Sequence, residues 1–353
     1  MDALITLLPG DGIGPEVTAA ARGMLKKIAD QFGHSFQFDV RLIGGAAIDK
    51  SQSPLPADTV ASCMDSSAVF LGAVGGPKWS DPNAPVRPEE GLLELRSVLG
   101  VYANLRPVQV MDELVNVSPL KAEYLTGVDL IVVRELTGGI YFGKKTRDET
   151  VASDLCTYHT HEVERIIRVA AKIAGERRNK LCSVDKANVL ETSRLWREVT
   201  DKTMKREFPD IEMETLLVDA AAMHLLSRPR DFDVIVTENM FGDILTDEAS
   251  MLAGSMGMLP SASLGDSARG LYEPIHGSAP DLAGKDIANP CGAIGSSAML
   301  LRHSLGLFDE ANAVEDAIHG AIAGGSRTAD IASEGDTVLT TTEMADAIIA
   351  RLG

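Results

Sequence analysis

Residues 231–250, DFDVIVTENMFGDILTDEAS, join a short apolar run to a segment with a different periodicity. The run VIVT at 234–237 has the composition of a buried strand. In the segment that follows, Asp243 and Asp247 stand four residues apart, and this spacing places them on one face of a helix. The stretch therefore predicts a strand, and a helix after it would carry the two carboxylates on one face.

The same alternation of short β-rich runs with segments of helical periodicity extends along the chain and predicts an α/β fold. Helices are expected over residues 15–32 and 190–208, and after Thr340, where Thr340 and Glu343 have the spacing of a capping box. No internal repeat or Gly/Ser linker is present. The expected strands are ALITLLP, FQFDVRLI, AVFLGAV, DLIVVRE, KLCSVDK, METLLVD and DFDVIVTE.

Composition narrows the class of protein. A chain of 353 residues exceeds the usual size of one core, which favours two domains or one large α/β unit. The net charge of −18, without a Lys/Arg block, argues against nucleic acid or an anionic membrane as partner. The N-terminus lacks the features of a signal peptide or membrane span, so a cytoplasmic protein is expected. The 4 cysteines form no C-x-x-C pair, which argues against a zinc site or a disulfide framework.

Ionisable residues cluster where the predicted strands end, which is the edge at which open α/β sheets bind ligands. Asp243 and Asp247, completed by Asp219, are candidate ligands for Mg²⁺ or Mn²⁺, since hard cations take carboxylate oxygens. A solvated acidic helix face is the alternative interpretation of this spacing. Lys186 is either a base or a surface lysine, and Tyr141 is either an acid or a packed aromatic.

Three arginines have the planar fork that suits bidentate capture of carboxylates: Arg96, Arg106 and Arg134. Surface ion pairing is the alternative for each of them.

The glycine-rich turn after the first predicted strand does not match a dinucleotide-binding motif, since Pro15 replaces the third glycine of a G-x-G-x-x-G fingerprint. The turn-rich loop over residues 276–290 is a candidate for wrapping a nucleotide, with Asp281 accepting from a ribose hydroxyl.

Taken together, these pieces resemble the β-decarboxylating dehydrogenases, the isocitrate/isopropylmalate dehydrogenase family. The resemblance extends over nearly the whole chain and is carried by LLPGDGIGPEV, GGPKW, GLLELR, YANLRPV, VRELTGGIYFG, DKANVL, ENMFGDILTDEAS, YEPIHGSAPDLAGKDIANP and SRTADI. It implies two α/β domains that are not Rossmann folds, with the active site in the cleft between them. Residues 1–100 with 252–353 would form the cofactor-binding domain, and 101–251 the domain for dimerisation, metal and substrate.

The resemblance is strongest to the isopropylmalate-oxidising members. It implies NAD-dependent oxidative decarboxylation of (2R,3S)-3-isopropylmalate to 4-methyl-2-oxopentanoate and CO₂ in leucine biosynthesis, by a homodimer whose active sites draw residues from both subunits. Lys186 and Asp219 would come from one chain, and Asp243 and Asp247 from the other. The implied roles are metal binding by Asp219, Asp243 and Asp247; substrate binding by Arg96, Arg106, Arg134, Leu92 and Asp219; and proton transfer by Lys186 and Tyr141.

The resemblance also implies the cofactor contacts. Members that use NADP tend to carry Lys-Tyr where this chain has Asp281-Leu282, so NAD is expected. Leu92 would touch the isopropyl group, and Glu89 would approach the nicotinamide ribose. The full set of implied cofactor contacts is Gly76, Glu89, Asn188, His276, Gly277, Ser278, Ala279, Asp281, Leu282 and Asn289.

Two other functions stay open at this point. A D-malate or tartrate dehydrogenase of the same family would share the arginines, aspartates, lysine and tyrosine. A non-catalytic regulatory paralogue would keep the fold, although such proteins typically lose one of the reacting groups. The chain also departs from the family pattern, with Ala329 in place of a proline and Gly292 and Gly295 where better helix formers are common.

Overall fold

The computed structural model describes residues 1–81 and 84–352, and the chain divides into two compact units. Unit 1 consists of Met1–Val101 and Gly254–Gly353, and unit 2 of Tyr102–Ala253. These boundaries lie beside the divisions expected near residues 100 and 251, while the roles expected of the two domains stay predictions. No helix among the described residues has both the length and the apolar character needed to cross a membrane.

The strands of unit 1 follow the order β2-β1-β3-β12-β11. β1 is parallel to both β2 and β3, and β12 is parallel to β3 but antiparallel to β11. Every residue of β3, AVFLGA, is buried, because this apolar strand lies between β1 and β12. The bounds are β1 Asp2–Gly10, β2 Ser35–Val40, β3 Ala68–Ala73, β11 Pro260–Leu264 and β12 Leu271–Pro274.

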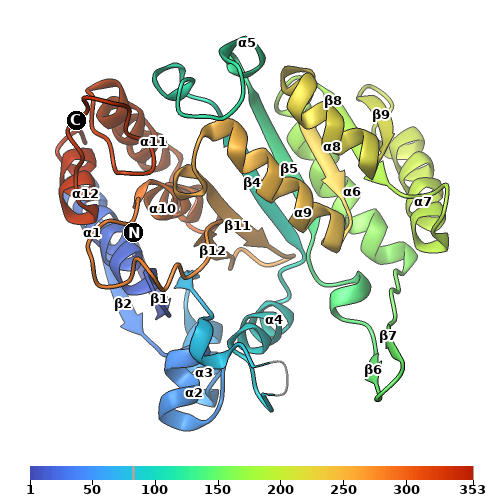
Figure 1. Ribbon diagram of the computed structural model, residues 1–353, viewed down its shortest axis with the longest axis horizontal. Coiled ribbons are helices and arrows are strands. Elements are labelled where there is room, and N and C mark those ends of the chain that lie inside the picture. The colour runs from blue at the N-terminus through green and yellow to red at the C-terminus, as the bar shows by residue number, and fades with distance from the viewer. Residues whose placement is uncertain (82–83, 353) are drawn as a thin grey trace. The chain divides into compact units, whose positions relative to one another are not determined.

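Two groups of helices accompany this sheet (Figure 1). One group is α1 Gly14–Phe32, α10 Cys291–His303, α11 Phe308–Ala323 and α12 Thr341–Ile349; the other is α2 Gly44–Ser51, α3 Ala57–Asp65 and α4 Pro88–Leu99. The predicted capping box starts α12: the Thr340 hydroxyl accepts from the Glu343 amide at 3.2 Å, and the Glu343 carboxylate accepts from the Thr340 amide at 2.9 Å. This prediction is confirmed.

The two unexpected glycines of α10 have a packing reason. A Cβ on Gly292 would lie 2.8 Å from the Leu259 carbonyl oxygen, and one on Gly295 would lie 3.2 Å from Pro260. The helix therefore passes the chain around residues 257–260 at a distance that leaves no room for a side chain at position 292. The departure from the family pattern at this position serves close packing, at the cost of some helix propensity.

Unit 2 has the strand order β4-β5-β10-β8-β9, in which β4 is antiparallel and the other strands are parallel. The helices α6 and α7 lie on one face of this sheet and α8 and α9 on the other, as right-handed crossovers between its parallel strands would place them (Figure 1). The strands are β4 Ala103–Gln109, β5 Asp129–Glu135, β8 Lys180–Asp185, β9 Glu212–Leu217 and β10 Val234–Thr237. The helices are α6 Thr160–Gly175, α7 Glu191–Glu207, α8 Val218–Ser227 and α9 Asn239–Ser250.

Some elements were not predicted from the sequence. β4, β11 and β12 contain prolines and polar residues, and the hairpin of β6 Lys145–Arg147 and β7 Ala152–Asp154 is exposed along its whole length. None of these has the apolar periodicity that identifies a strand. The remaining elements are α5 Ala122–Leu125 and the short 3₁₀ turns η1 Pro77–Trp79, η2 Asp112–Leu114, η3 Gly139–Tyr141, η4 Pro229–Asp231, η5 Met251–Ala253 and η6 Met256–Met258.

Candidate active site

The structure brings Arg134, Tyr141 and Asp243 together within unit 2. Arg134 lies at the carboxyl end of β5, and its Nη1 donates to Asp243 Oδ1 on α9 at 2.5 Å. The Tyr141 hydroxyl donates to the other oxygen of the same carboxylate at 2.9 Å, and the guanidinium lies 5.7 Å from the tyrosine ring centroid. Gly242 allows this approach, because a Cβ there would lie 2.6 Å from Arg134 Cγ.

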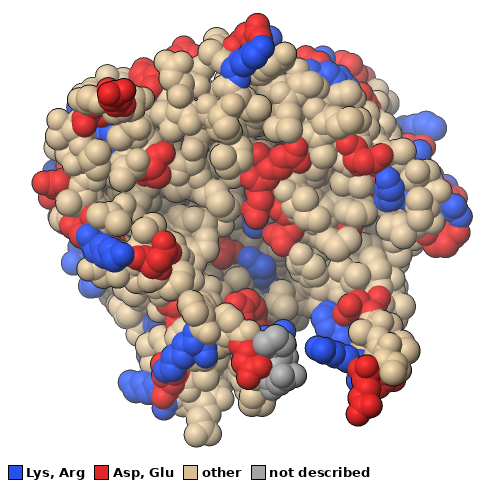
Figure 2. Space-filling model, in the orientation of Figure 1, with Lys and Arg blue, Asp and Glu red and all other residues tan. Residues whose placement is uncertain are grey.

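Arg106, on β4, completes the charge balance around α9. Its Nη2 lies 3.9 Å from Asp243 Oδ1 and its Nη1 lies 3.7 Å from Asp247 Oδ1. The two aspartates predicted from their spacing therefore face arginines that compensate their mutual repulsion. Acidic side chains gather over α9 in Figure 2, and this helix carries Asp243, Asp247 and Glu248.

The pKa values around α9 are perturbed. Burial, followed by the adjacent Asp243 charge, raises the pKa of Tyr141 to about 12. The phenol therefore keeps its proton at neutral pH. Partial withdrawal from water raises the pKa of Asp247; Arg106 opposes this shift and the like charge of Asp243 adds to it.

Lys186 and Asp219 form a separate pair in unit 2. Lys186 follows β8 and donates through Nζ to Asp219 Oδ1 at 2.5 Å, and Asp219 lies in the first turn of α8. This hydrogen bond lowers the pKa of Asp219. Within the described part of a single chain, no group of three or more His, Cys, Asp or Glu side chains is arranged to hold a metal. A ligand set of Asp219, Asp243 and Asp247 drawn from two subunits stays a prediction.

Arg96 and Leu92 lie on α4 of unit 1. Arg96 is buried and its Nη2 donates to Glu273 Oε1 on β12 at 2.8 Å, but its buried Nε has no hydrogen-bond partner among the described residues. A buried N–H of this kind is costly unless a ligand accepts from it. Leu92 is half-buried, and part of it packs against the unit 1 core.

Asp11 organises the turn that contains Gly76. Its carboxylate, 6% exposed, accepts from the amides of Gly45 and Gly75 at 2.8 Å and of Ala46 at 2.7 Å. Glu89 is exposed, and its Oε1 lies 2.7 Å from where a Cβ of Gly75 would stand. Gly75 has φ of +103°, so the chain there requires glycine for both conformation and space.

The loop over residues 276–290 contacts the glycine-rich turn after β1. The Ile13 amide donates to the Ser278 carbonyl at 2.8 Å, and a Cβ on Gly12 would lie 1.9 Å from that oxygen. Gly12 thus serves close packing of two loops, and Pro15 lies in the first turn of α1. This glycine of the turn therefore packs against another loop, and Pro15, which replaces the third glycine of the G-x-G-x-x-G motif, lies at the start of a helix.

His276 and Ala279 carry the unusual features of the same loop. His276 Nε2 is buried without a hydrogen-bond partner among the described residues, while Nδ1 lies 2.9 Å from the Gly277 carbonyl. Burial lowers the pKa of His276 and keeps the ring neutral. Ala279 has φ of +36°, which is strained for a residue with a Cβ. Gly277, Asp281 and Leu282 lie on the accessible part of the loop.

The side chains of the two predicted asparagines have different surroundings. Asn289 is buried; its Oδ1 accepts from the Cys291 amide at 2.9 Å and its Nδ2 donates to Asp330 at 3.0 Å. This amide is thus occupied in holding the start of α10. Asn188 is exposed in the turn after β8.

Asn104 and Thr246 contact the candidate site without having been predicted. Asn104 Oδ1 accepts from Arg106 Nε at 2.8 Å, and the Thr246 hydroxyl lies 2.6 Å from Arg106 Nη1. The only sequence signal was position, since Asn104 stands two residues before Arg106 and Thr246 lies between the two aspartates. A polar side chain next to a candidate residue does not by itself reveal which atom it holds.

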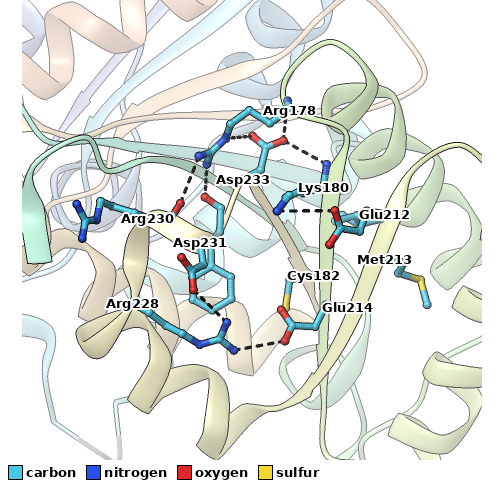
Figure 3. A pocket seen from close by; sticks show the side chains of 12 residues that line it. Arg178, Lys180, Cys182, Glu212, Met213, Glu214, Arg228, Arg230, Asp231 and Asp233 are labelled. Atoms are coloured by element: carbon cyan, nitrogen blue, oxygen red, sulfur yellow. Dashed lines mark hydrogen bonds and ion pairs between the residues drawn. The ribbon is translucent and has the colours of Figure 1, made fainter.

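A pocket of about 610 Å³ lies elsewhere in unit 2 (Figure 3). It is lined from the amino ends of β8 and β9 and the residues before β10, the opposite edge from the one at which parallel sheets bind ligands. Its charges pair with each other: Arg178 with Asp233 at 3.5 Å, Lys180 with Glu212 at 3.7 Å and Arg228 with Glu214 at 3.3 Å. None of the predicted site residues lines it.

Comparison with known proteins adds the decisive observation. The profile of the family "Isocitrate/isopropylmalate dehydrogenase" matches residues 4–348. The chain belongs to this family. The expected α/β fold class and the resemblance on which it rested are confirmed.

Relatives within the isocitrate/isopropylmalate dehydrogenase family are similar over their full length. The chain is 56% identical to 3-isopropylmalate dehydrogenase of Rhodopirellula baltica, covering 100% of this chain and 99% of the relative, and 57% identical to that of Bacillus subtilis, covering 94% and 92%. Among solved structures, isocitrate dehydrogenase from Methylococcus capsulatus superposes with a TM-score of 0.87 at 36% identity, covering 99% of each chain.

Proposed function

We propose that the chain oxidises (2R,3S)-3-isopropylmalate with NAD and releases CO₂, forming 4-methyl-2-oxopentanoate in leucine biosynthesis. The observation that carries this proposal is the 56% identity, over 100% of this chain, to a 3-isopropylmalate dehydrogenase. The side chains present suit the chemistry, since arginines, a lysine and a protonated tyrosine are the groups that a small dicarboxylate and its proton transfers require.

The arginines bind and orient the substrate. Arg96 has a buried Nε that a substrate carboxylate would satisfy. Arg106, in the middle of β4, and Arg134, near the carboxyl end of β5, are buried and hydrogen-bonded, so their forks are fixed before substrate arrives. Leu92 presents a partly exposed apolar surface suited to an isopropyl group.

Two groups move protons. Lys186 accepts the proton of the C2 hydroxyl through the lone pair of its neutral amine, after Nζ has released a proton. In the resting chain Nζ donates to Asp219, which orients it. Tyr141 donates a proton to the carbon from which CO₂ has departed, and its raised pKa keeps that proton available. A regulatory paralogue without chemistry would not need either group.

Asp219, Asp243 and Asp247 would hold Mg²⁺ or Mn²⁺, with Asp219 contributed by the partner subunit. Their oxygens are hard ligands, and the Asp219 and Asp247 side chains are accessible, with 63% and 60% of their areas exposed. When bound, the cation supplies Lewis-acid stabilisation of negative charge on the substrate oxygens.

The cofactor preference rests on Asp281. This residue, exposed in the loop over 276–290, accepts from the ribose 2′-hydroxyl and repels a 2′-phosphate, which favours NAD over NADP.

A homodimer is part of the proposal. Met223 on α8 and Ile244 on α9 are 63% and 59% exposed, and the two helices pack side by side. Exposed apolar side chains on adjacent helices suit an interface between two copies of the chain. Light scattering should therefore give a dimer, and Met223→Glu should shift it toward monomer. Phe308→Glu, at a residue of unit 1 that is 60% exposed, is the control that leaves the mass unchanged.

The test of the function is the rate of NADH formation with 3-isopropylmalate, with and without Mg²⁺ or Mn²⁺. We expect a metal-dependent absorbance increase with NAD and a much lower kcat/KM with NADP. D-malate, tartrate and isocitrate are the competing substrates. A higher kcat/KM on any of these three would contradict the proposed substrate.

A further inference from the structure

We infer that Asn239 is a positioning residue that fixes Arg134 and the loop carrying Tyr141 in one geometry. Asn239 is the first residue of α9 and its side chain is completely buried in unit 2. None of the roles assigned above falls on it. The inference rests on the proposed function, because Arg134 and Tyr141 act on the substrate only if that function is right.

One end of the Asn239 amide holds the arginine. Its Oδ1 accepts from Arg134 Nη2 at 2.8 Å and from Nε at 3.2 Å, so two donors of one guanidinium converge on a single oxygen. The remaining terminal nitrogen, Nη1, points to Asp243 at 2.5 Å. The orientation of the planar fork is therefore set by a neutral amide on one side and a carboxylate on the other.

The other end of the amide holds the loop that follows β5. Nδ2 donates to the carbonyl oxygens of Leu136 at 3.1 Å and Gly138 at 3.0 Å. These residues lead directly into η3, Gly139–Tyr141. One side chain thus contacts both the arginine that would grip the substrate and the segment that carries the proton donor.

Asn239 is itself fixed by its neighbours. Its backbone amide donates to the Tyr158 hydroxyl at 3.0 Å, and that hydroxyl donates to Glu238 Oε2 at 3.2 Å. Glu238 in turn caps α9 by accepting from the Phe241 amide at 2.9 Å. Only asparagine combines an acceptor and two donors at this length; aspartate keeps the acceptor alone, and alanine keeps neither.

The experiment is a set of steady-state measurements on full-length variants. Asn239→Ala should raise the KM for 3-isopropylmalate about tenfold or more and lower kcat, while the KM for NAD changes by less than about twofold. Asn239→Asp retains the acceptor for Arg134 but loses both donors to the loop. It should lower kcat with a smaller rise in substrate KM than the alanine variant shows.

A double-mutant cycle with Arg134→Lys separates positioning from general loss of structure. Because the lysine has one ammonium and cannot reproduce the two-donor contact, Asn239→Ala should raise KM much less in this background than in the wild type. Equal fold-changes in both backgrounds would overturn the inference. Ser183→Ala is the matched control: it removes another buried hydrogen bond of unit 2, to Trp196 Nε1 at 3.1 Å, and should leave the substrate KM unchanged.

Tyr158→Phe provides a milder variant if Asn239→Ala does not fold. It removes the hydroxyl that holds the Asn239 backbone and should raise the substrate KM in the same direction by a smaller factor; an unchanged KM and kcat would count against the inference. If the wild-type chain does not oxidise 3-isopropylmalate, the proposed function fails. The same double-mutant cycle can then be measured with the free energy of unfolding. If the effects of Asn239→Ala and Arg134→Lys on that free energy add, the two side chains are not coupled and the inference is rejected.

Discussion

Arg96 and Arg134 are both buried, one in each unit, and they are held in different ways. Arg134 is fixed by Asn239 and Asp243, whereas Arg96 forms one ion pair with Glu273 and keeps a buried Nε without a partner among the described residues. Among the described residues His276, also in unit 1, has a buried Nε2 without a partner, while none of the candidate side chains in unit 2 has such an atom. Unit 2 thus orients its groups internally, and unit 1 leaves nitrogens for a ligand to satisfy.

The largest expected effect on kcat comes from replacing Lys186, the proposed base of unit 2. Lys186→Met should lower kcat by about 10²–10⁴-fold, because the proton of the substrate hydroxyl loses its acceptor. The ion pair with Asp219 is exposed, so the thermal unfolding midpoint should change little. Lys202→Met removes another Lys–carboxylate pair of unit 2, with Glu198 at 2.8 Å, and should leave turnover intact. Undiminished turnover in Lys186→Met would show that Lys186 is not the base.

Arg96→Lys tests whether the buried Nε of Arg96 binds the substrate. The lysine keeps a positive charge near Glu273 but lacks the free Nε, so the KM for 3-isopropylmalate should rise about tenfold with a smaller change in kcat. Steady-state kinetics measures both constants. Arg302→Lys, where the native residue pairs with Glu315 at 2.6 Å in the same unit, is the control expected to behave as wild type. A rise in the KM for NAD alone would assign Arg96 to the cofactor.

A smaller effect is expected at His276. His276→Ala removes the unpartnered Nε2 and should raise the KM for NAD about three- to tenfold, the range of one hydrogen bond, without changing the KM for 3-isopropylmalate. His319→Ala, on the exposed surface of α11, is the matched control. An unchanged KM for NAD would remove His276 from the predicted cofactor contacts and weaken the contrast between the units.

The smallest effect is a dependence of stability on pH. Burial lowers the pKa of His276, so below about pH 6.5 the unfolded chain takes up a proton there and the folded chain does not. This contribution to stability is present above the unfolded pKa and is lost as the pH falls toward the folded one, by at most about 1.4 kcal/mol per pH unit. Denaturant unfolding should be measured for wild type and His276→Ala between pH 7.5 and 5.5. As the pH falls, the free energy of unfolding of the wild type should decrease more than that of the variant. Parallel pH profiles would contradict the shift.

Sequence reasoning worked best where the signal was local. The capping box at Thr340 and the strand VIVT appeared where expected, because each depends on periodicity or on spacing within a few residues. The segment with Asp243 and Asp247 is helical, which is the condition under which their spacing puts them on one face. The exposed hairpin β6–β7 and the proline-containing strand β4 were missed, since pairing partners rather than apolar patterning stabilise them.

For the candidate site, sequence determined the residue types and their place at strand ends. It did not determine which atoms would meet, because those contacts join residues far apart in the chain: Arg134 and Asp243 are 109 residues apart, and Arg96 and Glu273 are 177 apart. Asn239 had no local signal distinguishing it from any polar residue at a helix start.

The sequence by itself therefore determined the α/β alternation, the family and the identities of the groups available for chemistry, since these are properties of pattern and composition. Only the tertiary structure decided that Arg134 is oriented by two protein side chains while Arg96 keeps an Nε without a partner among the described residues, and that α10 needs glycine at position 292. The physical reason is that hydrogen bonds and close packing depend on distances of a few ångströms between distant segments, and folding alone sets those distances.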